Sequence, residues 1–159
     1  MTRLPSLGPR GVGWVAIQGV LLVLVAAAGW SVGPAWDGMA RVASAVAGVV
    51  LIVGGATLAI RGAHDLSDNL TPLPHPRDEA TLIQTGVYAR VRHPIYGGIV
   101  LAAIGWSLAM ASIAALVMTA ITWAFFTAKS MREEAWLVER FPDYPAYRAR
   151  TRRLIPWIG

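Results

Sequence analysis

Three short polar segments carry the residue types that could do chemistry. They are GVYARVRHPIYGG (86–98), MREEAWLVER (131–140) and FPDYPAYRARTRRLIPWIG (141–159). Together they supply tyrosines, basic side chains and paired acids: Tyr88, Arg90, Arg92, His93, Tyr96, Glu133, Glu134, Arg140, Tyr144, Tyr147 and Arg148. Carboxylates bind cationic groups, arginine and histidine bind anions, and aromatic faces attract cations. Such a set is suited to a zwitterionic, aromatic, water-soluble ligand.

Most of these side chains also have a purely structural interpretation. Arg90 and Arg92 are suited to lipid phosphates, and His93 is suited to the capping region of a helix that follows it. Tyrosines are enriched where a membrane meets water, so Tyr88 and Tyr96 fit that role too. The basic run 148–153 is typical of a lipid-facing patch. The adjacent acids Glu133 and Glu134 are harder to explain in this way, because near anionic lipid they need a cation to face.

Several kinds of site are excluded by the sequence. The chain has no cysteine, which rules out disulfides, thiolate nucleophiles and cysteine-based metal sites. His64, His75 and His93 are too far apart for a helical ligand pair, so we expect no metal site. The glycine pairs at 54–55 and 97–98 follow no strand and therefore are not dinucleotide-binding fingerprints.

The composition indicates a membrane protein of a single domain, residues 1–159. Of the 159 residues, 55% are hydrophobic and only 14% are charged, and the mean hydropathy is +0.52. A soluble globular domain carries about 25% charged residues. The net charge is +5. Because the basic residues flank apolar runs, we expect membrane lipids rather than nucleic acid as their partners.

The apolar runs predict an all-α, polytopic membrane protein with about four transmembrane helices. A membrane-crossing helix needs about 20 mainly apolar residues. The expected spans are 12–32, 42–60, 95–111 and 113–127. The last two come from one uncharged stretch, 94–128, which would extend about 50 Å as a single helix and is too long for one crossing. We therefore expect a helical hairpin that turns near Ser112.

Local features refine this prediction. The first run follows arginines, as in a signal peptide, but it is too long for one and is interpreted as a retained span. Small residues at 48 and 54–56 are suited to close helix packing. The prolines at 72, 74 and 76 exclude a regular helix there, while DEATLIQTGVYARV (78–91) could form a short amphipathic helix ended by Gly86. The last helix should continue to Pro142.

The distribution of basic residues predicts the orientation. Apart from Arg41, all basic residues fall on one side of the predicted spans, including Lys129 and Arg132, which we expect to snorkel to the interface. Under the positive-inside rule both termini, the loop 61–92 and the segment 129–159 are cytoplasmic. The three polar segments then converge on one cytoplasmic pocket above the bilayer.

The three segments together resemble a known family. GVYARVRHPIYGG, an apolar hairpin, and EEAWLVERFPDYPAYRARTRRLIPWI, with NLTPLP upstream, are similar to the isoprenylcysteine carboxyl methyltransferase and phospholipid methyltransferase group of integral membrane enzymes. The likeness covers roughly residues 69–159. It implies a methyltransferase that uses S-adenosyl-L-methionine and a lipophilic or amphiphilic small-molecule acceptor. One departure is local, since members of the group often have glycine where Pro142 or Asp143 stands.

The resemblance also implies residue roles. By motif position, the cofactor pocket would be formed by Tyr88, Arg92, His93, Tyr96, Gly97, Glu133 and Glu134. Tyr144, Tyr147 and Arg148 would contact the acceptor. On chemical grounds, and not from the resemblance, Glu134 or Arg148 is our candidate for tuning the acceptor during catalysis. Chemically, a glutamate can bind the ammonium or ribose hydroxyls of the cofactor, an arginine or His93 its carboxylate, and tyrosine rings its sulfonium.

Three questions stay open at this point. The acceptor could be a lipid amine, a carboxylate or a small isoprenoid. Eukaryotic enzymes that act on prenylated proteins have extra helices, so the resemblance does not imply a prenylcysteine substrate. A membrane reductase that uses a nicotinamide dinucleotide is an alternative, although its phosphates would favour cations over the acidic pair. A non-enzymatic membrane partner or transporter is the second alternative, but it predicts more polar residues inside the spans.

Overall fold

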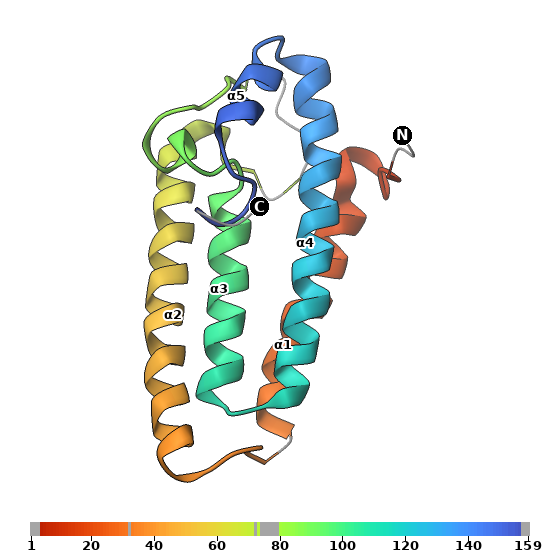
Figure 1. Cartoon of the computed structure of the whole chain (residues 1–159). Coiled ribbons are helices and arrows are strands. Elements are labelled where there is room, and N and C mark those ends of the chain that lie inside the picture. The colour runs from red at the N-terminus through yellow and green to blue at the C-terminus, as the bar shows by residue number, and fades with distance from the viewer. Residues whose placement is uncertain (1–3, 32, 72, 74–79, 157–159) are drawn as a thin grey trace.

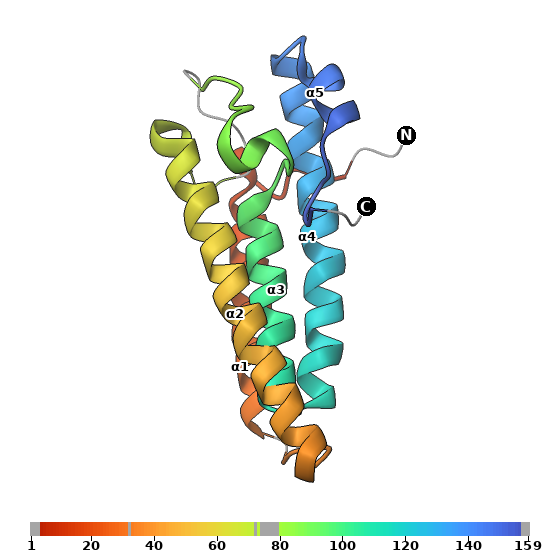
Figure 2. The same cartoon turned by 60° about the vertical axis from the view of Figure 1, so that its left-hand side comes forward.

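Four long helices form an antiparallel bundle in the computed structural model, which describes residues 4–31, 33–71, 73 and 80–156. They are α1 (Val12–Ser31), α2 (Gly38–Leu66), α3 (Pro94–Ala109) and α4 (Ile113–Arg140), and a short helix α5 (Tyr144–Arg150) follows. Three 3-10 turns, η1 (Pro9–Gly11), η2 (Ser67–Asn69) and η3 (Gly86–Ala89), lie between or before them. Both views place α5, η3 and the charged end of α4 at one end of the bundle (Figures 1 and 2).

The helix lengths confirm an all-α membrane protein. Helices α1, α2 and α4 are long and apolar enough to cross a membrane, and α3 is a shorter apolar helix of 16 residues. The 28 residues of α4 extend about 42 Å, more than the roughly 30 Å of a hydrocarbon core. Its charges all fall at residues 129–140, so this C-terminal part of α4 projects beyond the apolar layer.

The predicted hairpin of α3 and α4 is confirmed. Residues at the helix termini explain where each of these helices begins and where α4 ends. Pro94 stands at the first position of α3, where its missing N–H costs nothing. Ser112 caps α4 by accepting a hydrogen bond from the backbone N–H of Ala115 at 3.2 Å. At the far end, α4 stops at Arg140, just before Pro142, as expected.

Glycines spaced seven apart let α2 and α3 pack closely along their length (Figures 1 and 2). A Cβ built on Gly55 would lie 2.5 Å from the carbonyl oxygen of Gly98, and one on Gly48 would lie 2.5 Å from that of Gly105. Close approach at Gly48 and Gly55 confirms the expectation from the small residues, whereas a Cβ on Gly54 would meet nothing within 4 Å. This seam fixes α3, and with it the polar segment that precedes α3.

The two neighbouring glycines of α2 give a matched test of this seam. We expect Gly55→Ala to lower the free energy of unfolding by about 1–3 kcal/mol, because its methyl group would overlap α3 backbone atoms. Gly54→Ala should leave it unchanged or raise it by up to about 1 kcal/mol, since alanine favours helix. Thermal unfolding in detergent compares the two, and equal effects would contradict the close packing at Gly55.

Two expectations on local structure are wrong. The described part of the expected amphipathic helix, residues 80–85, is not helical, and η3 begins at Gly86 rather than the helix ending there. Lys129 does not snorkel, because its side chain is buried at 1% exposure and donates a hydrogen bond to Gln18 of α1. The proline-rich stretch 72–76, where we expected no regular helix, falls largely outside the described residues, and residues 32 and 157–159 fall outside them too.

Candidate functional site

The turn η3, which precedes α3, is held in place by the end of α2. The backbone N–H of Val87 donates to Oδ2 of Asp65 at 2.8 Å. Gly86 has a φ of +58°, a value that favours glycine, and a Cβ there would lie 2.0 Å from the same carboxylate oxygen. The hydroxyl of Tyr88 donates to the carbonyl of Gly62 in α2 at 3.3 Å. These contacts position Arg92 and His93 over the bundle.

The C-terminal segment pairs with this polar segment on its other side. Arg92 N–H donates to the carbonyl of Arg152 at 2.8 Å, and His93 N–H donates to that of Arg153 at 2.9 Å. A Cβ on Gly97 would lie 1.8 Å from the carbonyl oxygen of Leu154. Gly97, which we expected in the cofactor pocket, therefore makes room for the C-terminal segment instead.

Glu134 lies in a cluster of arginines. Its side chain is 3% exposed, and its carboxylate lies 2.9 Å from Nε of Arg92, 3.3 Å from Nε of Arg153 and 3.5 Å from Nε of Arg148. Arg92 also donates to the carbonyl of Arg148 at 3.0 Å and to Thr151. Glu134 thus joins α4 to α5 and to the segment before α3.

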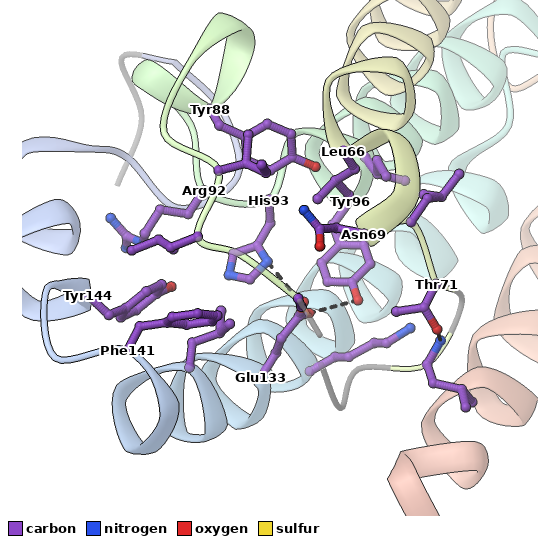
Figure 3. Close-up of a pocket in the computed structure, with 18 of the residues that line it drawn as sticks. Leu66, Asn69, Thr71, Tyr88, Arg92, His93, Tyr96, Glu133, Phe141 and Tyr144 are labelled. Carbon is purple, nitrogen blue, oxygen red and sulfur yellow. Dashed lines mark hydrogen bonds and ion pairs between the residues drawn. The ribbon is translucent and has the colours of Figure 1, made fainter. Parts of the chain in front are cut away.

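Glu133 points the other way, into a cavity. Its Oε2 accepts a hydrogen bond of 2.9 Å from the hydroxyl of Tyr96 and lies 3.7 Å from Nδ1 of His93 (Figure 3). The rings of His93 and Tyr96 stack with centroids 5.5 Å apart, and Phe126 packs against Tyr96 at 5.0 Å. At 24% exposure, the Glu133 side chain is reachable from the cavity.

The cavity has a volume of about 390 Å³ and lies at the charged end of the bundle. Small-molecule sites range over roughly 300–1,000 Å³. One part of its wall is aromatic and polar, and another is apolar. Its lining includes Tyr88, Arg92, His93, Tyr96, Glu133, Phe141, Tyr144 and Tyr147, with Val15, Gln18, Ile95, Ile99 and Lys129 from the long helices and Leu70 from the loop after η2. Figure 3 shows Glu133, His93, Tyr88 and Tyr144 around it.

The three tyrosine hydroxyls outside the spans have different partners. Tyr147 donates to the backbone carbonyl of Tyr88 at 2.8 Å, and Tyr88 donates to Gly62. The buried Oη of Tyr144 finds no hydrogen-bond partner among the described residues. Burial, opposed in part by Arg92, raises the pKa of Tyr147 to about 12, and burial, with Glu134, also raises that of Tyr144. All of these hydroxyls stay protonated near neutral pH.

The structure brings most of the predicted site residues together. Tyr88, Arg92, His93, Tyr96, Glu133, Tyr144 and Tyr147 line the cavity. Glu134, Gly97 and Arg148 lie outside its lining, and the Arg148 side chain is 48% exposed beside Glu134. Sequence reasoning missed Phe141, Lys129 and Gln18. The last two had a signal, since each is a rare polar residue in or beside an otherwise apolar span.

Comparison with known proteins shows which family the chain belongs to. Residues 43–144 match the family described as phospholipid methyltransferase. The chain belongs to the phospholipid methyltransferase family. The matched region contains the helical hairpin, both adjacent acids and most of the cavity wall, but not α1 or Tyr147.

Two relatives carry names more specific than that of the phospholipid methyltransferase family. The chain is 37% identical over 79 residues to the protein-S-isoprenylcysteine O-methyltransferase of Schizosaccharomyces pombe, covering 48% of this chain and 34% of that protein. It is 30% identical over 117 residues to the protein of the same name from Saccharomyces cerevisiae, covering 71% of this chain and 49% of that protein. The chain thus spans half or less of the length of these relatives.

Proposed function

We propose that the chain is a methyltransferase that uses S-adenosyl-L-methionine and transfers the methyl group to a lipophilic or amphiphilic acceptor at the membrane interface. Membership of the phospholipid methyltransferase family supports a methyl-transfer reaction. The observation that carries the choice of donor is the carboxylate of Glu133, which faces a cavity while its neighbour Glu134 is committed to arginines.

The cavity wall fits the chemical groups of S-adenosylmethionine. The Glu133 carboxylate is suited to the ammonium or ribose hydroxyls, with Tyr96 and His93 fixing its orientation. The hydroxyl of Tyr144, which has no hydrogen-bond partner among the described residues, can donate a hydrogen bond to a ligand oxygen or ring nitrogen. The faces of Tyr88, Phe141 and Tyr144 provide surfaces for an adenine ring or for the positive sulfonium.

When bound, S-adenosylmethionine supplies an electrophilic methyl group, and the protein must align an acceptor behind it. Alignment alone contributes about 7–11 kcal/mol in well-oriented reactions. The apolar part of the wall, with Val15, Ile95 and Ile99, would hold the start of an acceptor's tail while its head reaches the aromatic part. One substrate would then enter from water and the other from the bilayer.

The proposed roles of Glu134 and Arg148 differ from the catalytic roles that we expected from the sequence. Neither lines the cavity. Oε1 of Glu134 accepts hydrogen bonds from Arg92 and Arg153, and its Oε2 lies 3.5 Å from Nε of Arg148. We assign Glu134 a positioning role, because it orients Arg92 and attaches α5. Tyr144 and Tyr147 stay as candidate contacts of a bound ligand.

The orientation predicted from the basic residues is part of the proposal. The cavity lies at the end of the bundle that carries Arg92, Lys129 and the arginines of α5. Under the positive-inside rule this end, and both termini, face the cytoplasm, where the water-soluble donor is present.

Two tyrosines of α5 provide a matched test of ligand contact. Tyr144→Phe should leave thermal stability unchanged but weaken S-adenosylmethionine binding by about tenfold, since the Tyr144 hydroxyl has no described protein partner. Tyr147→Phe removes a 2.8 Å hydrogen bond to the Tyr88 carbonyl and should lower the free energy of unfolding by about 1 kcal/mol. Calorimetry and thermal unfolding distinguish these results, and the reverse pattern would contradict the assignment.

The proposed reaction is tested by isotope transfer. Membranes with the full chain, and matched membranes without it, are incubated with S-adenosylmethionine labelled at its methyl group. A labelled product in the organic extract of the first sample alone is the expected result. A parallel incubation with reduced nicotinamide adenine dinucleotide phosphate (NADPH) tests the reductase alternative. Oxidation of that cofactor without label transfer would overturn the proposal.

A further inference from the structure

One buried cation in the cavity wall has no carboxylate partner within salt-bridge distance among the described residues. Lys129 begins the charged part of α4, and its side chain is 1% exposed. Its Nζ donates a hydrogen bond to Oε1 of Gln18 in α1 and lies 4.9 Å from the centre of the Tyr96 ring. Both Lys129 and Gln18 line the cavity.

An ammonium group in such a place is incompletely compensated. It has three N–H donors, and its recorded hydrogen bond is to a neutral amide. Removing a charge from water is unfavourable unless an opposite charge and full hydrogen bonding compensate it. An anionic group of a ligand in the cavity would supply both.

The other strong cation of the wall is already committed. Arg92 donates through Nε to Glu134 and through one terminal nitrogen to the backbone of the C-terminal segment. We had expected an arginine or His93 to bind the cofactor carboxylate. The contacts of Arg92 leave Lys129 as the better placed donor.

Lys129 and Glu133 also form a matched pair of opposite charges. They stand four residues apart on α4 and therefore project from the same face, one turn apart. Tyr96 lies between them, with its ring near Lys129 and its hydroxyl bonded to Glu133. A negative and a positive protein group at this spacing complement the carboxylate and ammonium of an amino acid.

We propose that Lys129, oriented by Gln18, is a carboxylate-binding subsite of the cavity. This inference rests on the proposed function. The carboxylate belongs either to the amino-acid end of S-adenosylmethionine or to an acidic acceptor, since both would present the same oxyanion to the same ammonium.

Decarboxylated S-adenosylmethionine, which lacks only this group, separates the two sources. The purified full chain and its Lys129→Met variant are titrated with both compounds by calorimetry in detergent, and methyl transfer to a membrane lipid extract is measured. If the donor's carboxylate is bound, Lys129→Met weakens S-adenosylmethionine binding by about tenfold or more and leaves that of the decarboxylated compound unchanged. If the carboxylate of the acceptor is bound, Lys129→Met leaves the affinities for both donor compounds unchanged and lowers methyl transfer by a similar factor.

Three further variants sharpen the test. Lys129→Arg keeps the charge and should retain most of the activity, while Gln18→Leu should produce a weaker form of the Lys129→Met defect. Arg132→Met removes a nearby charge of the same helix outside the cavity lining and should have no effect. If Lys129→Met does not fold, a wild-type preference for S-adenosylmethionine over its decarboxylated form, together with the Gln18→Leu defect, supports the donor subsite.

Two results would overturn this inference. A folded Lys129→Met protein with wild-type donor binding and wild-type methyl transfer removes the subsite and leaves the proposed function intact. A wild-type chain that binds neither compound and transfers no methyl group overturns both.

Discussion

Glu133→Gln is expected to weaken S-adenosylmethionine binding by about 30-fold or more while leaving the fold intact. Truncating the charge of one partner in a buried, hydrogen-bonded pair costs about 2–5 kcal/mol. The glutamine keeps the shape and can still accept the 2.9 Å hydrogen bond from Tyr96. It lacks the negative charge that attracts an ammonium group. Calorimetric titration of the purified variant gives the affinity, and thermal unfolding gives the stability.

Glu139→Gln is the control for this variant. Glu139 is an exposed acid on the same helix, outside the cavity lining. Its neutralisation should leave binding unchanged, which would show that the effect at Glu133 is local and not a result of altered net charge. Equal binding by the wild type and the Glu133→Gln variant would remove Glu133 from the site.

Glu134→Gln, in contrast, is expected to act on the fold and to destabilise the protein by about 3 kcal/mol. Removing one partner of a buried ion pair leaves the other charge uncompensated, at a cost of about 3–5 kcal/mol. Here Arg92, at 7% exposure, would lose its charged partner at 2.9 Å, and Arg148 and Arg153 would repel it. Thermal unfolding in detergent measures the loss.

Limited proteolysis gives a second measure of the same change. Because Glu134 joins α4 to α5, its loss should expose residues 144–156 to cleavage before the bundle unfolds. The Glu133→Gln variant should show no such early cleavage. If instead Glu134→Gln were as stable as the wild type and Glu133→Gln unstable, the roles that we assign to the two acids would be exchanged.

The spans and the hairpin could be predicted from the sequence because each depends on local chemistry. Mainly apolar runs predict α1 and α2. Pro94 and Ser112 mark the starts of α3 and α4, through a missing N–H and through capping. The cluster of Tyr88, His93, Tyr96 and Glu133 could also be predicted, since the topology brings its segments to one end of the bundle.

The different surroundings of Glu133 and Glu134 could not be read from the sequence. Adjacent residues on a helix point about 100° apart, so the two carboxylates can face different groups, although His93 lies 3.7 Å from Glu133 and 3.4 Å from Glu134. Which of the two meets the arginines depends on where α5 docks. That docking uses hydrogen bonds between Arg92 and Arg152 and between His93 and Arg153, residues far apart in the chain.

The wrong predictions have similar causes. The segment before Tyr88 has an amphipathic pattern, but Asp65 binds Val87 and the positive φ of Gly86 starts a different turn. Lys129 was expected at the lipid interface because a lone lysine beside an apolar span usually snorkels. Gln18 on another helix provides the partner that keeps it inside.

The most direct measurement is an experimental structure of the full chain in lipid nanodiscs with S-adenosylhomocysteine. The account predicts that the nucleoside lies in the cavity between the end of α4 and the segment before α3, with a ligand nitrogen or hydroxyl within hydrogen-bond distance of the Glu133 carboxylate. A ligand bound elsewhere, or one that contacts Glu134 with Glu133 turned away, would contradict it.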